Sequence, residues 1–359
     1  MGKNILKQII DGLTIPLESD SSSEDVSAKE IEKNILDGIN KISLELTEII
    51  IKNEDKWFST YRLANDELSQ KNILFYQHGF NCLDLLYYLS LEIGKIFQEQ
   101  GENVKKESYA REHVLFRLHA KSLQITAEMI CLLRGGFADG ALGRWRSLHE
   151  CAVIMNCITN SCEDIAIRFL NHVEVERAKK MELYNKYAPK HFERYSQEHL
   201  DSVIIQAKKI VDYFGKGFND DYGWANTLFP NRGKKRVTFD DIADAFSMNT
   251  LKMHYKWACE KIHVTTNSLY RSISNNNENI MMAGASDNGF QDPVALLTIS
   301  LDQINTFMCI FLSKLDSMDP TALVLQKTFH SLCTKTELAF INLQEQKDKN
   351  YHENGIVFE

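Results

Sequence analysis

The segment GFADGALGRWRSLHECAVIMNCI, residues 136–158, decides how this chain folds. Its apolar residues surround nearly the whole circumference of a helix, and a helix that is apolar on all sides is normally buried in a core. The segment nevertheless carries Arg144, Arg146, His149 and Glu150 within two helical turns. Burying ionisable groups is costly unless they are paired and hydrogen-bonded. We therefore expect a central helix whose polar groups have a structural or a chemical role.

The composition is that of a globular protein, with 359 residues, 44% hydrophobic and 25% charged. The net charge of −8 argues against a basic surface over the whole molecule. The eight cysteines form no CxxC pair and no zinc-like spacing, so we expect no metal and no cofactor. Apolar runs are interrupted by charges and no secretory leader is recognised, which predicts a cytoplasmic protein outside the membrane.

Long runs without proline that are rich in helix-forming residues favour an all-α multi-helix bundle with long antiparallel helices. Gly135 and Gly136 separate two of the helical patterns and predict an antiparallel neighbouring pair. The regions 215–238 and 275–292 are rich in Gly, Asn and Asp and are expected to be irregular. Apolar spacing predicts helices over 28–52, 72–98, 108–134, 137–158, 163–187, 192–214, 250–274, 293–315 and 320–346.

The domain organisation is expected to be simple. Residues 1–25 combine a short amphipathic run with an acidic, Ser-rich linker, and such a segment suits docking to a protein partner. Residues 26–346 are predicted to form a single large helical domain, and residues 347–359 a C-terminal tail.

The polar side chains of the central helix have candidate partners. Arg146 and Glu150 are four residues apart, so they share a helix face and can pair. Glu128 lies in the preceding apolar helix, and counting turns about the paired glycines predicts that it contacts Arg146. A buried structural ion-pair network and a functional cleft both remain open as interpretations.

The run Arg146-Ser147-Leu148-His149-Glu150 resembles the signature helix of DUF5677, a bacterial family of unknown function. That family tends to show Arg-Ser-Leu-x-Glu, with an aromatic residue where His149 stands. A later run, Tyr255 to His263, resembles a second family helix, and the likeness extends over about residues 108–315. The resemblance implies an all-helical fold, and it implies that Tyr255 and His263 join Arg146 and Glu150 in one cleft. It supplies no reaction, and a helix-end packing role for His263 stays open.

The run Arg144-Trp145-Arg146-Ser147-Leu148-His149 also resembles the Arg-x4-His motif of HEPN-type helical ribonucleases and toxins. That resemblance implies a HEPN-like core, metal-independent cleavage of RNA and a motif helix that meets its copy in a homo-oligomer. Arg144 would then stabilise the transition-state phosphate, and His149 would act as general acid or base. A second instance, Arg194 to His199, lies on a polar helix.

A basic loop offers a further candidate site. Just before an expected helix start at Phe239, the loop carries four cations: Arg232, Lys234, Lys235 and Arg236. Such a charge run is either solvated or contacts RNA phosphates without reading sequence.

Two hypotheses follow from the sequence. One is an RNA-cleaving toxin or phage-defence effector, with Arg144 and His149 as the catalytic pair and with Arg146, Glu150, Glu128, Tyr255 and His263 in support. The other is a non-catalytic helical sensor or scaffold, whose polar cluster locks the bundle or binds a protein partner or a small ligand. Whether the chain is an enzyme is left open by the sequence.

Overall fold

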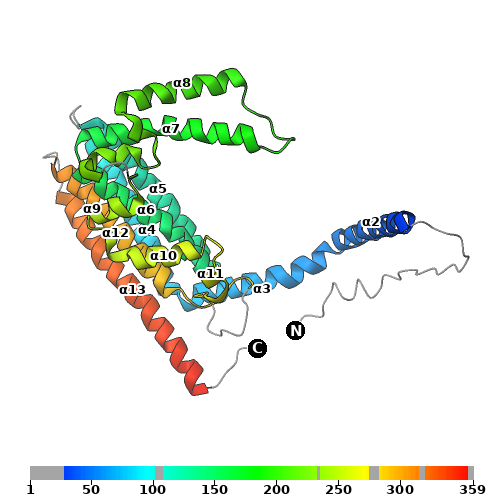
Figure 1. The fold of residues 1–359 in the computed structure, drawn as a ribbon. Helices are drawn as coiled ribbons and strands as arrows, with labels where there is room; N and C mark the ends of the chain where they lie inside the picture. The colour runs from blue at the N-terminus through cyan, green and yellow to red at the C-terminus, as the bar shows by residue number, and fades with distance from the viewer. Residues whose placement is uncertain (1–27, 102–107, 233–234, 275–282, 315–319, 355–359) are drawn as a thin grey trace, which may run out of the picture. The chain divides into compact units, whose positions relative to one another are not determined.

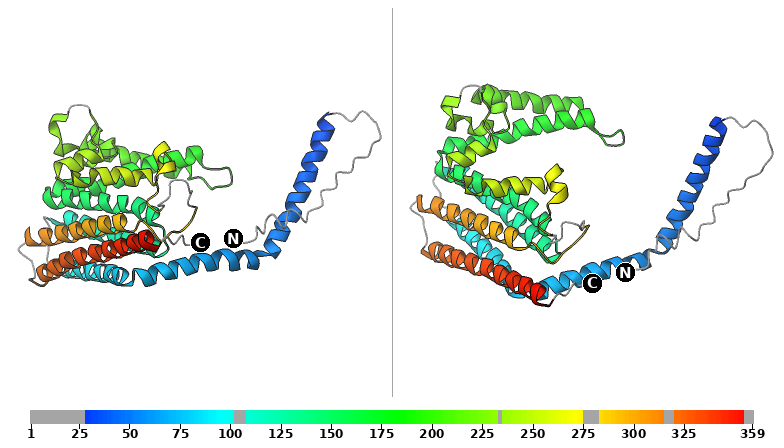
Figure 2. Two further views of the ribbon diagram at one scale, coloured as in Figure 1. Left: turned by 90° about the horizontal axis from the view of Figure 1, so that it is seen from below. Right: turned by 60° about the horizontal axis from the view of Figure 1, so that its bottom comes forward.

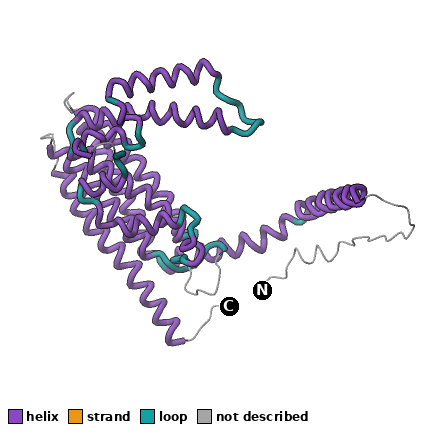
Figure 3. The backbone as a smooth tube through the Cα atoms, viewed as in Figure 1, coloured by secondary structure: helices purple, strands orange, loops and turns teal. Residues whose placement is uncertain are grey.

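The computed structural model describes residues 28–101, 108–232, 235–274, 283–314 and 320–354. Within these ranges the regular elements are all helices, so the all-α prediction is confirmed (Figures 1 and 3). The amphipathic N-terminal run and the acidic linker lie outside the described residues. The elements are α2 (Ala28–Lys52), α3 (Glu54–Phe75), α4 (Gln77–Gly101), α5 (Tyr109–Arg134), α6 (Ala138–Asn160), α7 (Glu163–Tyr187), α8 (Gln197–Phe214), η2 (Lys216–Asn219), η3 (Gly223–Leu228), η4 (Pro230–Arg232), α9 (Phe239–Ala245), η5 (Asn249–Leu251), α10 (Lys252–Glu260), α11 (Thr266–Tyr270), α12 (Gln291–Lys314) and α13 (Pro320–Asn354).

The chain divides into two compact units, Met1–Lys71 and Asn72–Glu359. This boundary falls inside α3, whereas the sequence predicts a single domain over residues 26–346. In the first unit, the described residues form α2 and most of α3. The second unit contains the bundle and the candidate site.

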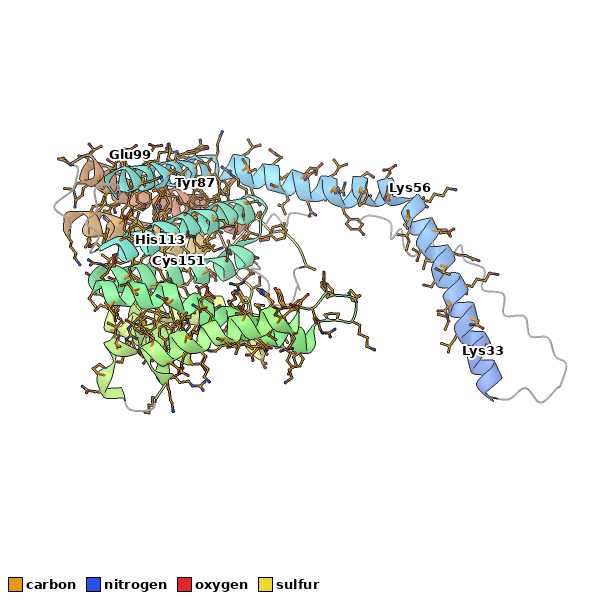
Figure 4. The ribbon with its side chains drawn as sticks, turned by 90° about the horizontal axis from the view of Figure 1, so that it is seen from above. Lys33, Lys56, Tyr87, Glu99, His113 and Cys151 are labelled. Atoms are coloured by element: carbon orange, nitrogen blue, oxygen red, sulfur yellow. The ribbon has the colours of Figure 1, made fainter. Side chains whose placement is uncertain are left out.

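The bundle is built around α6. Helices α5 and α12 pack along it, α4 packs against α5 and α13, and α10 crosses α6 (Figure 2). Side chains fill the space between these helices (Figure 4). Cys151 of α6 is one of them: it is buried, and its thiol lies beside Ser122 of α5. Helix α6 is therefore central, as residues 136–158 predict.

The turn between α5 and α6 depends on a glycine. Gly136 has a φ of +82°, a left-handed backbone conformation that favours glycine. Its carbonyl accepts a hydrogen bond from the backbone N–H of Ser286 at 2.9 Å. A Cβ at this position would meet the Ser286 carbonyl oxygen at 2.5 Å. The tight turn sets α5 and α6 side by side.

Helix α12 corrects the expectation that charges interrupt every long apolar run. It is long and apolar enough to cross a membrane by length and composition, yet 67% of its apolar window is buried within the protein. It packs against α6 and α13, so its apolar residues are those of a core helix.

Candidate functional site

The apolar stripe of α6 faces the core. Trp145, Leu148, Ala152 and Met155 are fully buried. The Trp145 indole N–H donates to the hydroxyl of Ser300 on α12 at 2.9 Å, so the one polar group of this side chain is satisfied. The remaining faces of α6 therefore position the ionisable residues.

A three-residue network joins α6 to α10. Arg146 Nη2 lies 2.9 Å from Glu150 Oε1, which confirms the predicted pair. The Tyr255 hydroxyl donates to Glu150 Oε1 at 2.6 Å and accepts from Arg146 Nε at 3.0 Å. The guanidinium carbon of Arg146 also lies 5.2 Å from the centre of the Tyr255 ring, a cation–π distance. We call Arg146, Glu150 and Tyr255 the α6–α10 network.

The network is half-buried, and it shifts the pKa of Tyr255 and of Arg146. The Arg146 and Glu150 side chains are each 28% exposed. Burial, and then the hydrogen bond to Glu150, raises the pKa of Tyr255, so its hydroxyl stays protonated and donates. Burial opposes the charge of Arg146, but the carboxylate of Glu150 and the Tyr255 hydroxyl raise its pKa. The network is therefore an ion pair between Arg146 and Glu150 that the Tyr255 hydroxyl bridges.

His149 is buried among aromatic rings. Its ring stacks on Trp145 with centroids 5.3 Å apart and lies 6.2 Å from Phe239 of α9 and 5.8 Å from Tyr255 of α10. Its Nδ1 is buried and has no hydrogen-bond partner. Burial lowers the pKa of His149 to about 4, so the imidazole is neutral near pH 7.

Arg144 lies on another face of α6 and corrects the predicted partner of Glu128. Its Nε donates to the Glu128 carboxylate on α5, and its Nη1 donates to the Ser147 hydroxyl at 3.2 Å. Glu128 therefore pairs with Arg144, not with Arg146. The reason is helical geometry, since two residues along a helix turn the side chain by about 200°, which points Arg144 to α5 and Arg146 to α10. Arg144 and His149 do not come together.

His263 also departs from the expected cleft. Helix α10 ends at Glu260, and His263 follows it as an exposed residue. Among the described residues, no hydrogen bond or ion pair joins its side chain to the α6–α10 network. The predicted cleft required a helix that continues through His263. Because α10 ends at Glu260, His263 does not share the helix face that carries Tyr255.

The structure describes part of the basic loop. Arg232 closes η4, Lys234 lies outside the described residues, and Lys235 is exposed. Arg236 pairs with Asp220 at 3.1 Å. Of the two loop cations whose side chains the structure describes, Lys235 and Arg236, the second is thus engaged with a carboxylate of the same chain.

A small pocket lies beside His149. It is lined by His149, Phe239, Asp240, Ala243, Met248, Asn249, Lys252 and Tyr255. Its cavity volume is about 10 Å³, close to the least space that holds one water molecule. This volume is far below the roughly 300 Å³ at which small-molecule sites begin. Within the described residues, no group of His, Cys, Asp or Glu side chains could hold a metal ion.

A second buried polar cluster, which no sequence pattern predicted, is formed by Ser90 of α4, His119 of α5 and Asn305 of α12. The Asn305 Oδ1 accepts from the Ser90 hydroxyl at 2.9 Å and lies 3.1 Å from His119 Nε2. Burial lowers the pKa of His119 to about 4, against the smaller effect of the Asn305 bond. In the sequence, the one sign of this cluster is that each of three apolar helical runs contains one of these polar residues. The cluster holds three bundle helices in register.

One family model matches part of the chain. Residues 112–280 match the model of DUF5677, described as a family of unknown function. The predicted likeness to this family is confirmed, over a shorter range than 108–315. No curated protein and no solved structure matches the chain, so the likeness to HEPN-type proteins gains no support from these comparisons.

Proposed function

We propose that residues 112–280, the segment that matches the DUF5677 family model, form a non-catalytic helical scaffold that binds a protein partner through the outer surface of α10 and α11. The α6–α10 network holds that surface in place. The proposal also assigns the chain to the cytoplasm, the compartment expected from its free cysteines.

The observation that carries the proposal is the Tyr255 hydroxyl between Arg146 and Glu150. Each of the three side chains contacts the other two, and together they tie α10 to α6. Such an arrangement suits a positioning role, because a half-buried polar cluster whose members bond one another favours one packing geometry over others.

The outer face of α10 and the residues after it supply the binding surface. This surface carries five large, exposed, mostly apolar side chains. They are Met253, Trp257, Val264, Leu269 and Tyr270, and the most exposed are Val264 at 88% and Tyr270 at 80%. We call these five residues the α10–α11 surface. Aromatic residues and methionine are enriched in protein interfaces, and exposed apolar groups gathered in one region often mark them. The pocket beside His149 is too small for a ligand of ordinary size, which favours a protein partner over a small molecule.

RNA cleavage by Arg144 and His149 is the alternative. It would require both side chains to act on one phosphate, and their placement on different faces of α6 gives this alternative less support. A neutral imidazole with no exposed edge is also poorly placed for proton transfer to a large substrate.

Site-specific photocrosslinking tests the proposed partner surface. A photoreactive amino acid at position 257 of the full chain, expressed in cells, should give a discrete crosslinked protein. Tyr270→Ser on the same surface should weaken that crosslink at least fivefold, while Tyr213→Ser, an equally exposed tyrosine on α8, should leave it unchanged. Absence of a discrete crosslinked protein, or equal effects of both substitutions, would count against the proposal.

An RNA-cleavage assay separates the two functions. The purified full chain is incubated with a mixture of structured and single-stranded RNA, beside Arg144→Ala and His149→Ala variants. The scaffold proposal predicts intact RNA in all three. Cleavage by the wild type that both variants lose would establish the alternative.

A further inference from the structure

Helix α11 displays two residues of the α10–α11 surface without a buried side chain of its own. None of its residues is buried, and Leu269 and Tyr270 are 61% and 80% exposed. A helix of five residues also gains little stability from its own backbone. Contacts outside α11 therefore have to hold it beside α10.

The Asp139 carboxylate, in the first turn of α6, makes such contacts. Lys261, the residue directly after α10, places its Nζ 2.7 Å from Asp139 Oδ1. The chain that follows α11 reaches the same carboxylate through the Ser272 hydroxyl and the backbone N–H groups of Ile273 and Ser274, the last two at 3.3 and 3.4 Å. One carboxylate therefore joins the end of α10 to the chain that leaves α11.

Lys261 closes the α11 segment from its other side. Its Nζ also donates to the Arg271 carbonyl oxygen at 2.6 Å. The side chain of Lys261 is 11% exposed and that of Asp139 is 29% exposed, so solvent screens this ion pair less than an exposed one. Burial opposes the charge of Asp139, but the bonds from Lys261 and Ser272 outweigh it and lower the pKa of Asp139. The carboxylate is therefore ionised at neutral pH.

We propose that Asp139 is a positioning residue of the α10–α11 surface. It acts through Lys261 and through residues 272–274, and so fixes Leu269 and Tyr270 relative to Trp257. This role rests on the proposed function, because it concerns how the partner surface is presented. Two separate anchors then hold the surface, the α6–α10 network on α10 and Asp139 beyond it.

Limited trypsin cleavage of the full chain tests the anchor without any partner. Asp139→Asn loses the charge that pairs with Lys261, and its amide nitrogen would face a donor with which it cannot bond. Cleavage after Arg271 should therefore become at least fivefold faster, because proteases cut where the backbone opens locally.

Asp221→Asn is the matched control, since the Asp221 carboxylate is 92% exposed, and it should leave the rate after Arg271 unchanged. Cleavage after Lys190, in the exposed loop between α7 and α8, corrects for differences in protease activity. An unchanged rate after Arg271 in Asp139→Asn would overturn the anchor.

Partner binding tests the positioning role. With the photoreactive amino acid at position 257, Asp139→Asn should weaken the crosslink at least threefold. In a Tyr270→Ser background the same substitution should weaken it by less than a further twofold, because both changes act through α11. Faster cleavage after Arg271 with an unchanged crosslink would overturn the positioning role. A wild type without a crosslink would contradict the proposed function itself, and the cleavage rate would still decide whether Asp139 anchors α11.

Discussion

At the scale of single residues, the ion pair between Arg146 and Glu150 contributes less to the free energy of unfolding than a fully buried pair would. From the sequence alone, a buried pair predicts a loss of about 3–5 kcal/mol when one partner is removed. Because both side chains are 28% exposed, water stabilises the charge that remains. The half-exposed pair therefore contributes to positioning more than to stability.

We expect Arg146→Met to lower the free energy of unfolding by about 1–2 kcal/mol, because it removes one ion pair and one charged hydrogen bond. Urea unfolding followed by circular dichroism measures this change. Lys180→Met is the matched control, since it breaks an exposed i,i+4 pair with Glu176 and should cost less than about 0.5 kcal/mol. A loss above about 3 kcal/mol for Arg146→Met would show that the pair is fully desolvated.

The two buried histidines predict acid sensitivity. Burial lowers the pKa of His149 and of His119 from 6.5 to about 4. Between these values the unfolded chain binds protons that the folded chain does not, so stability is fully present above pH 6.5 and is lost as the pH falls toward 4. Each histidine accounts for about 3 kcal/mol of that loss.

Urea unfolding at pH 7 and pH 4.5 measures the slope. His149→Phe should reduce the difference in unfolding free energy between the two pH values by up to about half, since His119 remains. Substitution of the exposed His199 by Gln should leave the difference unchanged. Stability that does not fall between pH 7 and pH 4.5 would contradict the buried, neutral state of both rings.

How much of the site could be predicted depended on how local each contact is. The Arg146–Glu150 pair follows from a four-residue spacing, and Tyr255 was found through the family resemblance. The partner of Glu128 was wrong because a two-residue error in register turns a side chain to another helix. The contacts of Ser90, His119 and Asn305 depend on three helices that are distant in sequence, so no local pattern could pair them.

At the scale of elements, residues 28–52 and 163–187 were predicted with the bounds that α2 and α7 have. The helix expected over 250–274 is instead two helices. Thr265 accepts a hydrogen bond from the backbone N–H of Ser268 and forms a capping box, which starts a new helix after α10 has ended. Helix α3 was missed because its polar sequence has little helical periodicity of apolar residues.

The α5–α6 turn gives a prediction at this scale. Gly136→Ala should destabilise the protein by about 2 kcal/mol or more, because alanine is strained at a φ of +82° and its Cβ would press on the Ser286 carbonyl. Gly140→Ala, within α6, is the control: its Cβ meets nothing closer than 3.6 Å. It should be neutral or stabilise by about 0.5–1 kcal/mol. Thermal unfolding of both variants checks the difference, and equal melting temperatures would refute the argument.

At the scale of the whole molecule, a helical bundle carries the exposed α10–α11 surface. Helix α6 lies at the centre, its apolar stripe faces the core, and its polar face positions α10. The all-α class and the central place of residues 136–158 could be predicted because they follow from composition and periodicity. The division of the chain at Lys71 could not be predicted from the sequence, because it depends on which helices pack together.

Hydrogen exchange of the full chain, with and without Tyr255→Phe, measures whether the α6–α10 network holds α10 in place. We expect that loss of the hydroxyl speeds exchange of the α10 amides by about tenfold, because one charged hydrogen bond that ties α10 to α6 is removed. The α12 amides should exchange at the wild-type rate, as should the α10 amides of Tyr270→Phe. Unchanged protection of α10 in Tyr255→Phe would contradict the claim that the α6–α10 network holds this surface in place.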